Sequence, residues 1–403
     1  MELHQYAANT QGIFKIQDIK EGLKVLHVTA AYKPAVIYGG PTMSVSSLCE
    51  ELVKSGQTIE VFTTTANGPT ELDVKAGLRT SVDGVPVTYF KRLTKDHTHF
   101  SPALLKALWK RAAEFDAIHI HAWWNLVSVL SCLVAVIKKV PVIVSPRGML
   151  SSYTFSNKNM GVKKLIHEIV GKKLLQKSHI HATSAYEAIA IAKLLTPLSI
   201  TDIPNFVKLG SAIFKPKAHS QRTGVLKLLF FSRIEEKKGL DIFIDALPLI
   251  NAPISLTIAG SGSIEYINQL KGKVSSLGLD DRINWVGFHD MDKFDVLAAH
   301  DLLVLPSYDE NFGNVVVEAL SVGTAVLISE HVGLAGYVAQ NKLGWVCEQN
   351  TNDLANTINE IYINQGHQLA RIRQEASDRV TADFSGAQLT QRYIDFYRQI
   401  ISK

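Results

Sequence analysis

The chain has 403 residues, of which 46% are hydrophobic and 20% charged, and its formal net charge is +5. This length exceeds one ordinary hydrophobic core, so we expect a soluble globular protein with two domains. The basic excess is small beside that of a nucleic-acid-binding protein, which excludes nucleic acid as an expected partner.

Cysteines and apolar runs bear on the compartment in which the protein works. The three cysteines, Cys49, Cys132 and Cys347, are scattered without metal-ligand spacing, which fits buried thiols in a reducing compartment. No apolar run reaches the roughly 20 residues that span a bilayer, and the best one, at 126–137, is predicted to be a buried helix. Because residues 1–22 lack the apolar core of a signal peptide, we expect an N-terminal extension of a cytoplasmic protein.

The first half of the chain alternates predicted strands with helices. Strands are expected at 24–29, 59–64, 85–90, 140–145 and 179–183, and helices from the Gly39-Gly40-Pro41 segment through Lys54 and at 102–114. This alternation is typical of an open α/β sheet, in which ligands bind beyond the carboxyl ends of the strands. Gly39 and Gly40 would let a ligand approach the backbone, although Gly-Gly-Pro also occurs in ordinary loops.

Two histidines and one arginine stand at predicted strand ends. His119 and His121 alternate along one strand and so share a face. Histidine is the commonest metal ligand, but no third ligand follows at a suggestive spacing, and we expect no metal here. Arg147 follows the strand at 140–145 between a proline and a glycine. We interpret it as a phosphate or acceptor contact, with a surface arginine as the alternative.

A lysine-rich segment follows at residues 160–177. It holds five lysines, Lys163, Lys164, Lys172, Lys173 and Lys177, against one acid, Glu168. Such a segment suits contact with anionic lipid, where each basic residue contributes about 1 kcal/mol. A solvated helical face is the alternative, because two of the lysines intrude on the apolar arc and Gly171 interrupts the helix. We therefore consider peripheral contact with the inner face of a membrane.

A polar segment without periodicity, 215–224, has the composition of a linker. It predicts a first domain over 1–214, a second over 225–385, and a terminal helix over 386–403 that returns to the first domain. Strands of the second domain are expected at 226–232, 254–260, 282–286, 302–305 and 325–328. Arg233 and Lys238 follow the first of these strands. A planar fork of donors and a point charge together suit a diphosphate. Solvated surface charge is the alternative, above all for Glu235, Glu236 and Lys237.

The segment from 302 to 328 is predicted to be strand, loop, helix and strand. Glu310 lies in the loop and Glu318 in the helix, eight positions later. If the helix begins at Gly313, Glu318 lies about 7.5 Å further along the axis, roughly the span of a diphosphate. A phosphate at the helix start would meet the free N–H groups of residues 312–315 and the positive end of the dipole. The alternative is two solvated glutamates, with equal weight on the residues alone.

This segment resembles the motif of the retaining glycosyltransferases of family 4, whose GT-B architecture has two Rossmann-like domains facing a cleft. The resemblance implies that Glu310 contacts the donor sugar and that Glu318 binds the nucleotide ribose. It also implies that Arg233 and Lys238 hold the diphosphate. His121 would hydrogen-bond the donor sugar and His119 would be structural. The wider set implied to bind the donor is Gly39, Gly40, Gly260, Val286, Gly287, Phe312, Gly313, Asn314 and Val315.

The resemblance also implies an activity. It is the retaining transfer of a hexose-type sugar from a UDP- or GDP-sugar to a saccharide or lipid-linked acceptor in polysaccharide or glycan biosynthesis, without metal or cofactor. A sugar-nucleotide epimerase of the same fold and a non-catalytic sugar-nucleotide-binding subunit remain as alternatives. One departure concerns Pro204-Asn205-Phe206-Val207, where the family usually has Pro-Asn-Gly-Val, so a glycine turn is missing.

Overall fold

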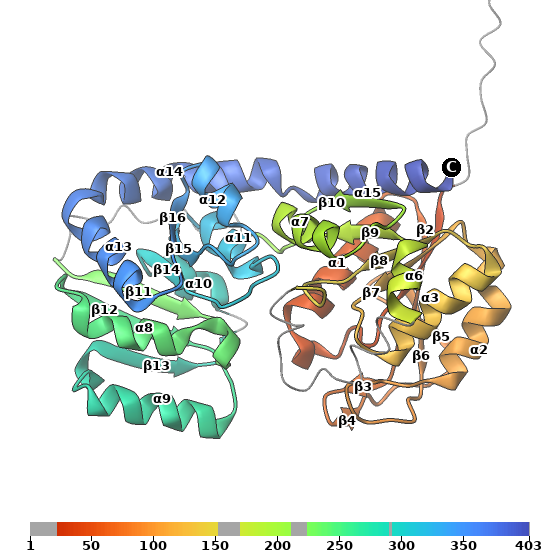
Figure 1. Ribbon diagram of the computed structural model, residues 1–403, viewed down its shortest axis with the longest axis horizontal. Coiled ribbons are helices and arrows are strands. Elements are labelled where there is room, and N and C mark those ends of the chain that lie inside the picture. The colour runs from red at the N-terminus through yellow and green to blue at the C-terminus, as the bar shows by residue number, and fades with distance from the viewer. Residues whose placement is uncertain (1–21, 152–169, 211–223, 290–291, 403) are drawn as a thin grey trace, which may run out of the picture.

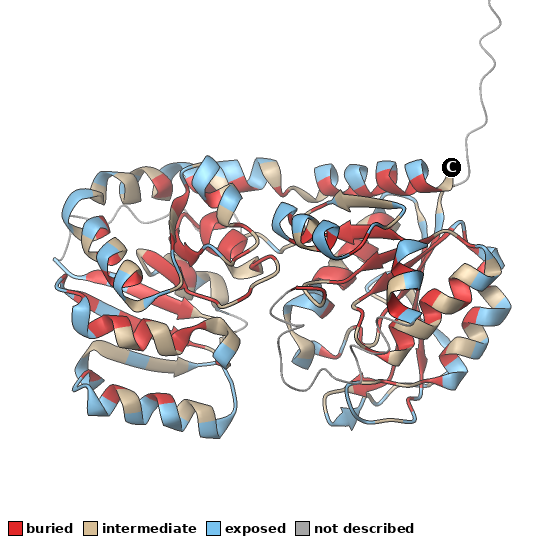
Figure 2. Ribbon diagram, viewed as in Figure 1, coloured by how far each residue is buried: buried red, intermediate tan, exposed pale blue. Residues whose placement is uncertain are grey.

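The computed structural model describes residues 22–151, 170–210, 224–289 and 292–402. They form two α/β units, each built on its own sheet, and Figure 1 shows the units side by side. Buried residues concentrate in the sheets and on the helix faces that cover them (Figure 2). This architecture confirms the predicted fold class. The N-terminal extension, nearly all of the predicted linker and the first part of the lysine-rich segment lie outside the described residues, so the domain boundaries stay predictions.

The first sheet has the strand order β10-β9-β8-β7-β1-β2-β6-β5. Its strands are β1 (Lys24–Val28), β2 (Thr58–Thr64), β5 (Arg79–Val82), β6 (Val85–Phe90), β7 (Ala117–His121), β8 (Val142–Ser145), β9 (His179–Ala182) and β10 (Ser199–Asp202). All neighbours run parallel except the pair β5 and β6. From β1 the chain proceeds to one edge, and from β7 to the other. The switch point, where ligands bind in such sheets, therefore lies between β1 and β7.

Helices cover both faces of the first sheet. They are α1 (Gly40–Lys54), α2 (Pro102–Arg111), α3 (Leu126–Lys138), α6 (Lys172–Gln176) and α7 (Ala185–Leu194), with short turns η1 (Val36–Tyr38) and η2 (Ala112–Glu114) and a hairpin of β3 (Ala66–Asn67) and β4 (Thr70–Glu71). Several begin at side-chain caps: Asn125 Oδ1 accepts from the Ser128 N–H at 2.8 Å, and Ser184 Oγ from the Glu187 N–H at 3.1 Å. The helix predicted at 102–114 ends as α2 at Arg111 and continues as η2.

The second sheet is parallel throughout, in the order β13-β12-β11-β14-β15-β16. Its strands are β11 (Leu226–Phe231), β12 (Ile254–Ala259), β13 (Ile283–Gly287), β14 (Leu302–Leu305), β15 (Ala325–Ser329) and β16 (Gly344–Cys347). β11 leads to β12 on one side and β14 to β15 on the other, so the switch point lies between β11 and β14. The loops that follow these two strands carry the predicted diphosphate and carboxylate residues.

The helices of the second unit close a single large core with this sheet. They are α8 (Leu240–Ala246), α9 (Ile264–Ser276), α10 (Lys293–Ala298), α11 (Asn314–Ser321), α12 (Ala335–Gln340), α13 (Thr351–Asn364) and α14 (Gly366–Asp383), with turns η4 (Glu236–Lys238), η5 (Leu247–Leu249) and η6 (Asp280–Arg282). Strands such as β14 are buried at every position, as expected for a parallel sheet covered on both faces.

The last helix, α15 (Gly386–Ile401), lies along the first unit (Figure 1). Successive residues of a strand point to opposite faces, and Val25 and Leu26 of β1 accordingly belong to different cores. The core on the Val25 side includes Tyr393 and Tyr397 of α15. The final helix of the chain therefore completes the core of the unit that contains the beginning of the sheet.

Candidate active site

The loops after β11 and β14 meet at a glycine. Gly239 has φ +70° and caps α8, and a Cβ on it would lie 2.0 Å from the Pro306 carbonyl oxygen. A side chain there would force the two loops apart. This close approach places Lys238 beside Glu310, and its ammonium group forms an ion pair with the Glu310 carboxylate. Two predicted site residues 72 positions apart thus meet at the switch point of the second sheet.

The second predicted carboxylate, Glu318, is also paired with a lysine. It lies on the buried side of α11, and its Oε1 accepts from Lys293 Nζ at 2.7 Å. Lys293 begins α10 and was not singled out from the sequence, because nothing in the spacing of 25 residues indicates the contact. Each glutamate thus has a lysine that balances its charge.

Helix α11 begins at Asn314, one residue later than predicted. Gly313 caps it with φ +90°, a left-handed conformation that favours glycine. The amide of Val316 already donates to the Gly313 carbonyl oxygen, so the unused helix-start N–H groups are those before it. The Phe312 side chain is buried and lies edge-on to Phe384. Its amide, rather than its ring, is what remains for a ligand.

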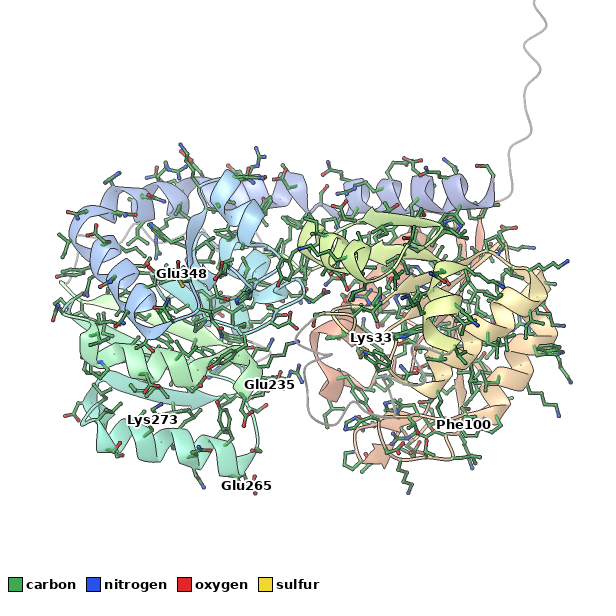
Figure 3. All side chains as sticks on the ribbon, in the orientation of Figure 1. Lys33, Phe100, Glu235, Glu265, Lys273 and Glu348 are labelled. Carbon is green, nitrogen blue, oxygen red and sulfur yellow. The ribbon has the colours of Figure 1, made fainter. Side chains whose placement is uncertain are left out.

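The cationic loop after β11 only partly matches the predicted diphosphate pocket. Arg233 is 61% exposed and pairs with Glu235, at 3.1 Å between Nη2 and Oε1. Glu235 lies on the side of the second unit that faces the first (Figure 3). Lys237, considered a candidate for solvated charge, instead pairs with Asp309 at 2.8 Å. The arginine is therefore not held beside Lys238 by any contact that the structure records, and it would have to turn towards a ligand.

Gly260 follows β12 and packs closely on a neighbouring strand, and Gly287 is the last residue of β13. A Cβ on Gly260 would lie 1.8 Å from the Ser232 carbonyl oxygen, so only glycine fits where β12 ends beside β11. The Gly260 N–H donates to the Gly287 carbonyl oxygen at 2.7 Å, and Gly287 follows Val286 at the end of β13. These contacts fix the rim of the second sheet. Contacts of Gly260, Val286 and Gly287 with a nucleotide stay predictions.

The loop at 309–314 hydrogen-bonds directly to the first unit. Asn311 contributes two bonds, one from its side-chain Nδ2 to Thr183 Oγ1 at 2.6 Å and one from Ser184 Oγ to its carbonyl oxygen at 3.0 Å. Asp309 accepts from Ser151 Oγ at 2.9 Å. The loop that carries the predicted donor residues is therefore held against the first unit.

Asn314 and Asn205 join the units beside the glycine loop. Asn205 Nδ2 donates to Asn314 Oδ1 at 3.2 Å, and a Cβ on Gly40 would lie 3.1 Å from Asn314 Nδ2. Gly39, with φ +65°, caps α1 just before it. Phe206, which replaces the usual glycine of the family, stacks on Tyr393 of α15 with ring centroids 5.7 Å apart. The departure from the family pattern thus adds a contact with the final helix.

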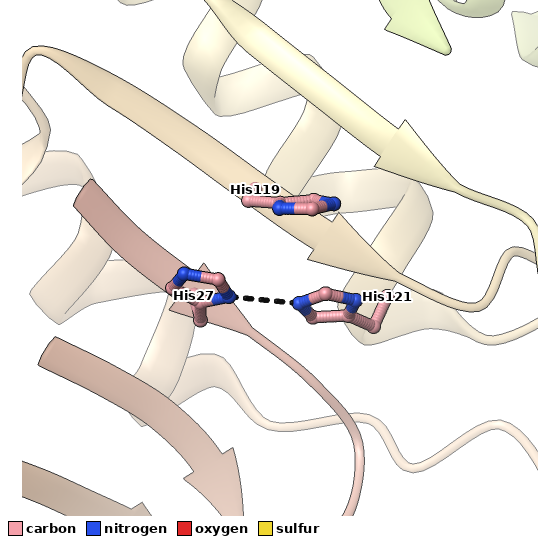
Figure 4. Close-up of side chains that lie close together, drawn as sticks. All are labelled: His27, His119 and His121. Atoms are coloured by element: carbon pink, nitrogen blue, oxygen red, sulfur yellow. Dashed lines mark hydrogen bonds between the residues drawn. The ribbon is translucent and has the colours of Figure 1, made fainter. Parts of the chain in front are cut away.

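His121 lies at the end of β7 as part of a buried histidine cluster (Figure 4). Its Nε2 is 2.9 Å from His27 Nδ1, and its Nδ1 is 3.5 Å from Arg147 Nη2. His119 instead bonds Tyr397 and Ser145 through its two ring nitrogens. His119 is thus part of a structural network, whereas His121 lies next to the arginine.

Sequence spacing shows no third ligand beside this pair, but the fold brings a third histidine to it. His27 of β1 lies opposite His119 in the parallel register, and the ligand atoms of His27, His119 and His121 fall within 4.8 Å of one another. The pairing of β1 with β7 creates the cluster, and sequence spacing does not show which strands are neighbours. The adjacent Arg147 guanidinium argues against a cation here, because two positive charges would repel each other at short range.

The arginine also sets the protonation of these rings. A guanidinium only donates, so His121 Nδ1 accepts from Arg147 and the ring proton of neutral His121 lies on Nε2. That proton is donated to His27 Nδ1, which leaves the His27 proton on Nε2, an atom without a partner in the described structure. Burial and the Arg147 charge keep the cluster neutral, and the pKa of His27 falls to about 3.

We expect this cluster to make the protein acid-sensitive. Burial lowers the pKa of the three clustered histidines and of His181, whose ring lies edge-on to that of His119. Their folded pKa lies below the unfolded value of about 6.5, so the unfolded state binds more protons as pH falls. The free energy of unfolding should therefore decrease from about pH 6.5 downwards, by about 1.4 kcal/mol per pH unit for each histidine.

Thermal melts between pH 7.5 and 5 measure this effect. Replacing the exposed His97 with Gln should leave the pH dependence unchanged, whereas His181→Gln should flatten it. A melting temperature of the native protein that stays constant over this range would contradict the prediction.

The alternative for Arg147 was a surface arginine, but its side chain makes hydrogen bonds inside the first unit. Its side chain donates from Nη1 to Ser44 Oγ at 3.0 Å and to Asn205 Oδ1 at 2.9 Å. Its backbone has φ +54°, an uncommon conformation for a residue with a Cβ. The buried carboxylate of Glu187 holds the turn by accepting from the Gly148 N–H at 2.6 Å. Arg147 therefore stands in a fixed loop, as predicted, although its ligand remains a prediction.

Comparisons with known proteins match both halves of the chain. Residues 39–205 match the family model described as "Glycosyl transferase 4-like domain", and residues 212–379 match "Glycosyl transferases group 1". The structure of Anabaena Alr3699/HepE in complex with UDP-glucose has a TM-score of 0.70 and 22% identity, over 94% of this chain and all of that one. The chain belongs to the family-4 type of GT-B glycosyltransferases.

Two curated relatives of this glycosyltransferase differ in how much of its length they match. Glycogen synthase of Mycobacterium tuberculosis is 25% identical over 90% of this chain and 91% of its own. Mannosylfructose-phosphate synthase of Agrobacterium fabrum is 35% identical, but over only 27% of this chain and 26% of its own length. The family is therefore shown along both halves, whereas the sugar and acceptor of a relative do not transfer to this chain.

Proposed function

We propose that this glycosyltransferase moves a hexose-type sugar, with retention of its anomeric configuration, from a UDP- or GDP-sugar to a saccharide or lipid-linked saccharide in glycan biosynthesis. The observation that carries the proposal is the ion pair of Lys238 and Glu310 at the switch point of the second sheet. It sets a cation for a phosphate and a carboxylate for sugar hydroxyls side by side, beside the start of α11.

The proposed chemistry is mainly electrostatic. The bond between the anomeric carbon and the diphosphate oxygen breaks while the acceptor oxygen bonds to the same face of the sugar, and the leaving phosphate takes the acceptor proton. Lys238, Arg233 and the N–H groups at the start of α11 stabilise the charge that develops on the leaving diphosphate. Glu310 and His121 orient the sugar, and Glu318 binds the ribose. Because both ring nitrogens of His121 already have partners, the sugar would have to displace Arg147 or His27 from one of them.

The test is a panel of sugar nucleotides followed by turnover. A donor that binds should raise the melting temperature, because ligands that bind only the folded state stabilise it. With that donor, transfer to an added saccharide supports the proposal. Conversion of the donor sugar without any acceptor would instead support the epimerase alternative, and binding without conversion would support a non-catalytic subunit.

We expect turnover without a divalent metal. Lys238 and Arg233 supply positive charge where a metal ion would otherwise neutralise the diphosphate. Initial rates should be equal, within about twofold, in a chelator and in magnesium or manganese. The matched control is a chelator-treated sample to which metal is restored. Loss of activity with the chelator that magnesium or manganese reverses would contradict the expectation.

We also propose peripheral contact with an anionic membrane surface through the lysine-rich segment. Lys172, Lys173 and Lys177 lie at or beside α6, whereas Lys163, Lys164 and Glu168 lie outside the described residues. Within the described ranges, no helix is both long and apolar enough to cross a bilayer. Any membrane contact of these residues would therefore be made at the surface.

Sedimentation with vesicles tests this contact. Binding to vesicles that contain anionic lipid should be strong at low salt and weaker at physiological salt, because ions screen exposed charges. Replacement of Lys163, Lys164 and Lys172 by Gln should reduce binding by about a hundredfold if each contributes about 1 kcal/mol. Three exposed lysines of the second unit, replaced in the same way, serve as the control. Absence of binding even at low salt would favour a soluble acceptor.

A further inference from the structure

The Arg147 side chain is half-buried, its Nε is fully buried, and its recorded partners are all neutral. Its Nη1 donates to Ser44 and Asn205 and its Nη2 to a neutral His121, whereas its Nε–H has no partner among the described residues. Among the residues that the structure describes, no carboxylate lies within ion-pair distance of it. Burial without such a partner lowers the pKa of the arginine. Because a buried charge is costly unless it is paired, the arrangement is complete only with an anion.

The nearby acid, Glu187, serves a different purpose. One of its carboxylate oxygens accepts from the Gly148 N–H at 2.6 Å, and the other from the Thr183 N–H at 2.8 Å. The carboxylate therefore fixes the turn around Arg147 instead of neutralising the guanidinium. A left-handed residue with a Cβ persists only when its surroundings hold it, and such strain gathers at ligand sites.

The edge of the guanidinium that carries the unpartnered Nε–H suits an oxyanion. Nε shares one edge of the planar group with Nη2, and a guanidinium uses such an edge to form two parallel bonds to a phosphate or carboxylate. The neutral His121 that accepts from Nη2 is not an anion. Asn205, which bonds Arg147, also bonds Asn314 at the start of α11. The charge thus lies where the first unit meets the helix proposed to hold the donor phosphates.

We propose that Arg147 binds an anionic group, a phosphate or a carboxylate, on the acceptor. The inference rests on the proposed function. The second unit already offers Lys238, Arg233 and a helix start to the donor diphosphate, whereas Arg147 belongs to the first unit, to which we assign the acceptor. The acceptor is therefore an anionic saccharide, such as a sugar phosphate, a uronic acid or a saccharide on a phosphate linkage, rather than a neutral sugar.

The experiment uses inorganic phosphate as the probe in the full-length protein. The protein is first saturated with the nucleoside diphosphate that the donor panel selects, so that the donor phosphate site is filled. Phosphate is then titrated while the melting temperature is measured. The samples are the native protein, Arg147→Met, Arg147→Lys and the control Arg79→Met, which removes a largely exposed arginine of the same unit.

We expect phosphate to raise the melting temperature of the native protein and of Arg79→Met in a concentration-dependent way. The shift should be lost in Arg147→Met and reduced in Arg147→Lys, which keeps the charge but not the planar fork. Nucleoside diphosphate affinity, measured by calorimetry, should stay within about twofold in all four proteins, and this also verifies that the variants are folded.

Two results would overturn the proposal. One is a phosphate shift that is absent in the native protein or unchanged in Arg147→Met. The other is a loss of nucleoside diphosphate affinity of about tenfold or more in Arg147→Met, which would identify the donor as the source of the anion. If no sugar nucleotide binds the native protein, the proposed function fails separately, and phosphate titrated without nucleotide still compares the same four proteins.

Discussion

Lys238→Ala is expected to weaken binding of a nucleoside diphosphate about ten- to a hundredfold and to reduce sugar transfer at least as much. A charge-assisted hydrogen bond contributes about 1.5–3 kcal/mol, and Lys238 would make one to the diphosphate. The substitution also leaves the Glu310 carboxylate without the cation that balances it. The repulsion between this carboxylate and the incoming phosphates adds to the loss.

Calorimetry with the bare nucleoside diphosphate measures this effect without an acceptor. Lys273→Ala is the matched control, because Lys273 also pairs with a carboxylate, at 2.6 Å from Asp245, but on α9 (Figure 3). Arg233→Ala should weaken binding in the same direction, since its exposed guanidinium can turn towards the phosphates. If Lys238→Ala and Arg233→Ala both bind the nucleoside diphosphate with unchanged affinity, the diphosphate does not bind at this loop.

Substitutions of Glu310 and Glu318 should affect the binding of different parts of the donor. Glu318→Ala should weaken binding of the bare nucleoside diphosphate, because its proposed partner is the ribose, and it also leaves Lys293 without its carboxylate. Glu310→Ala should leave that binding nearly intact, since it frees Lys238 for the phosphates, while transfer falls by about a hundredfold or more if a charged hydrogen bond to the sugar is lost in the transition state.

Calorimetry and initial rates on the same preparations test this division. Melting temperatures show whether either variant is merely unfolded. Glu330→Ala, which changes an exposed glutamate near the same loops, is the control. If Glu310→Ala and Glu318→Ala lose nucleoside diphosphate binding to the same extent, the assigned roles are wrong.

Much of the fold follows from the apolar pattern of the chain. The run of β14 is buried along its whole length and that of β11 at four of its six positions, and parallel strands covered by helices need such apolar runs. The edge strand β5 escaped prediction because its residues, Arg79–Val82, are mainly polar and exposed. It pairs in the antiparallel direction with β6 through backbone groups, which any sequence supplies.

The site was harder to predict than the fold for one physical reason. Local spacing predicts which residues follow a strand, and the motif residues Lys238 and Glu310 were found in this way. Spacing does not predict which strands are neighbours. His27 joins His121 only because β1 pairs with β7, and Lys293 reaches Glu318 only through the packing of α10 on α11.

The position of α15 has a consequence for how the protein forms during translation. Residues 386–401 are made after the second unit, yet Tyr393 and Tyr397 fill the core beside β1, which is made before the second unit. Domains usually fold as units while the chain emerges. The nascent first unit instead keeps an apolar face uncovered until the second unit has been translated. Its final folding step therefore waits for the synthesis of the second unit, and synthesis that stops before residue 386 leaves an aggregation-prone product.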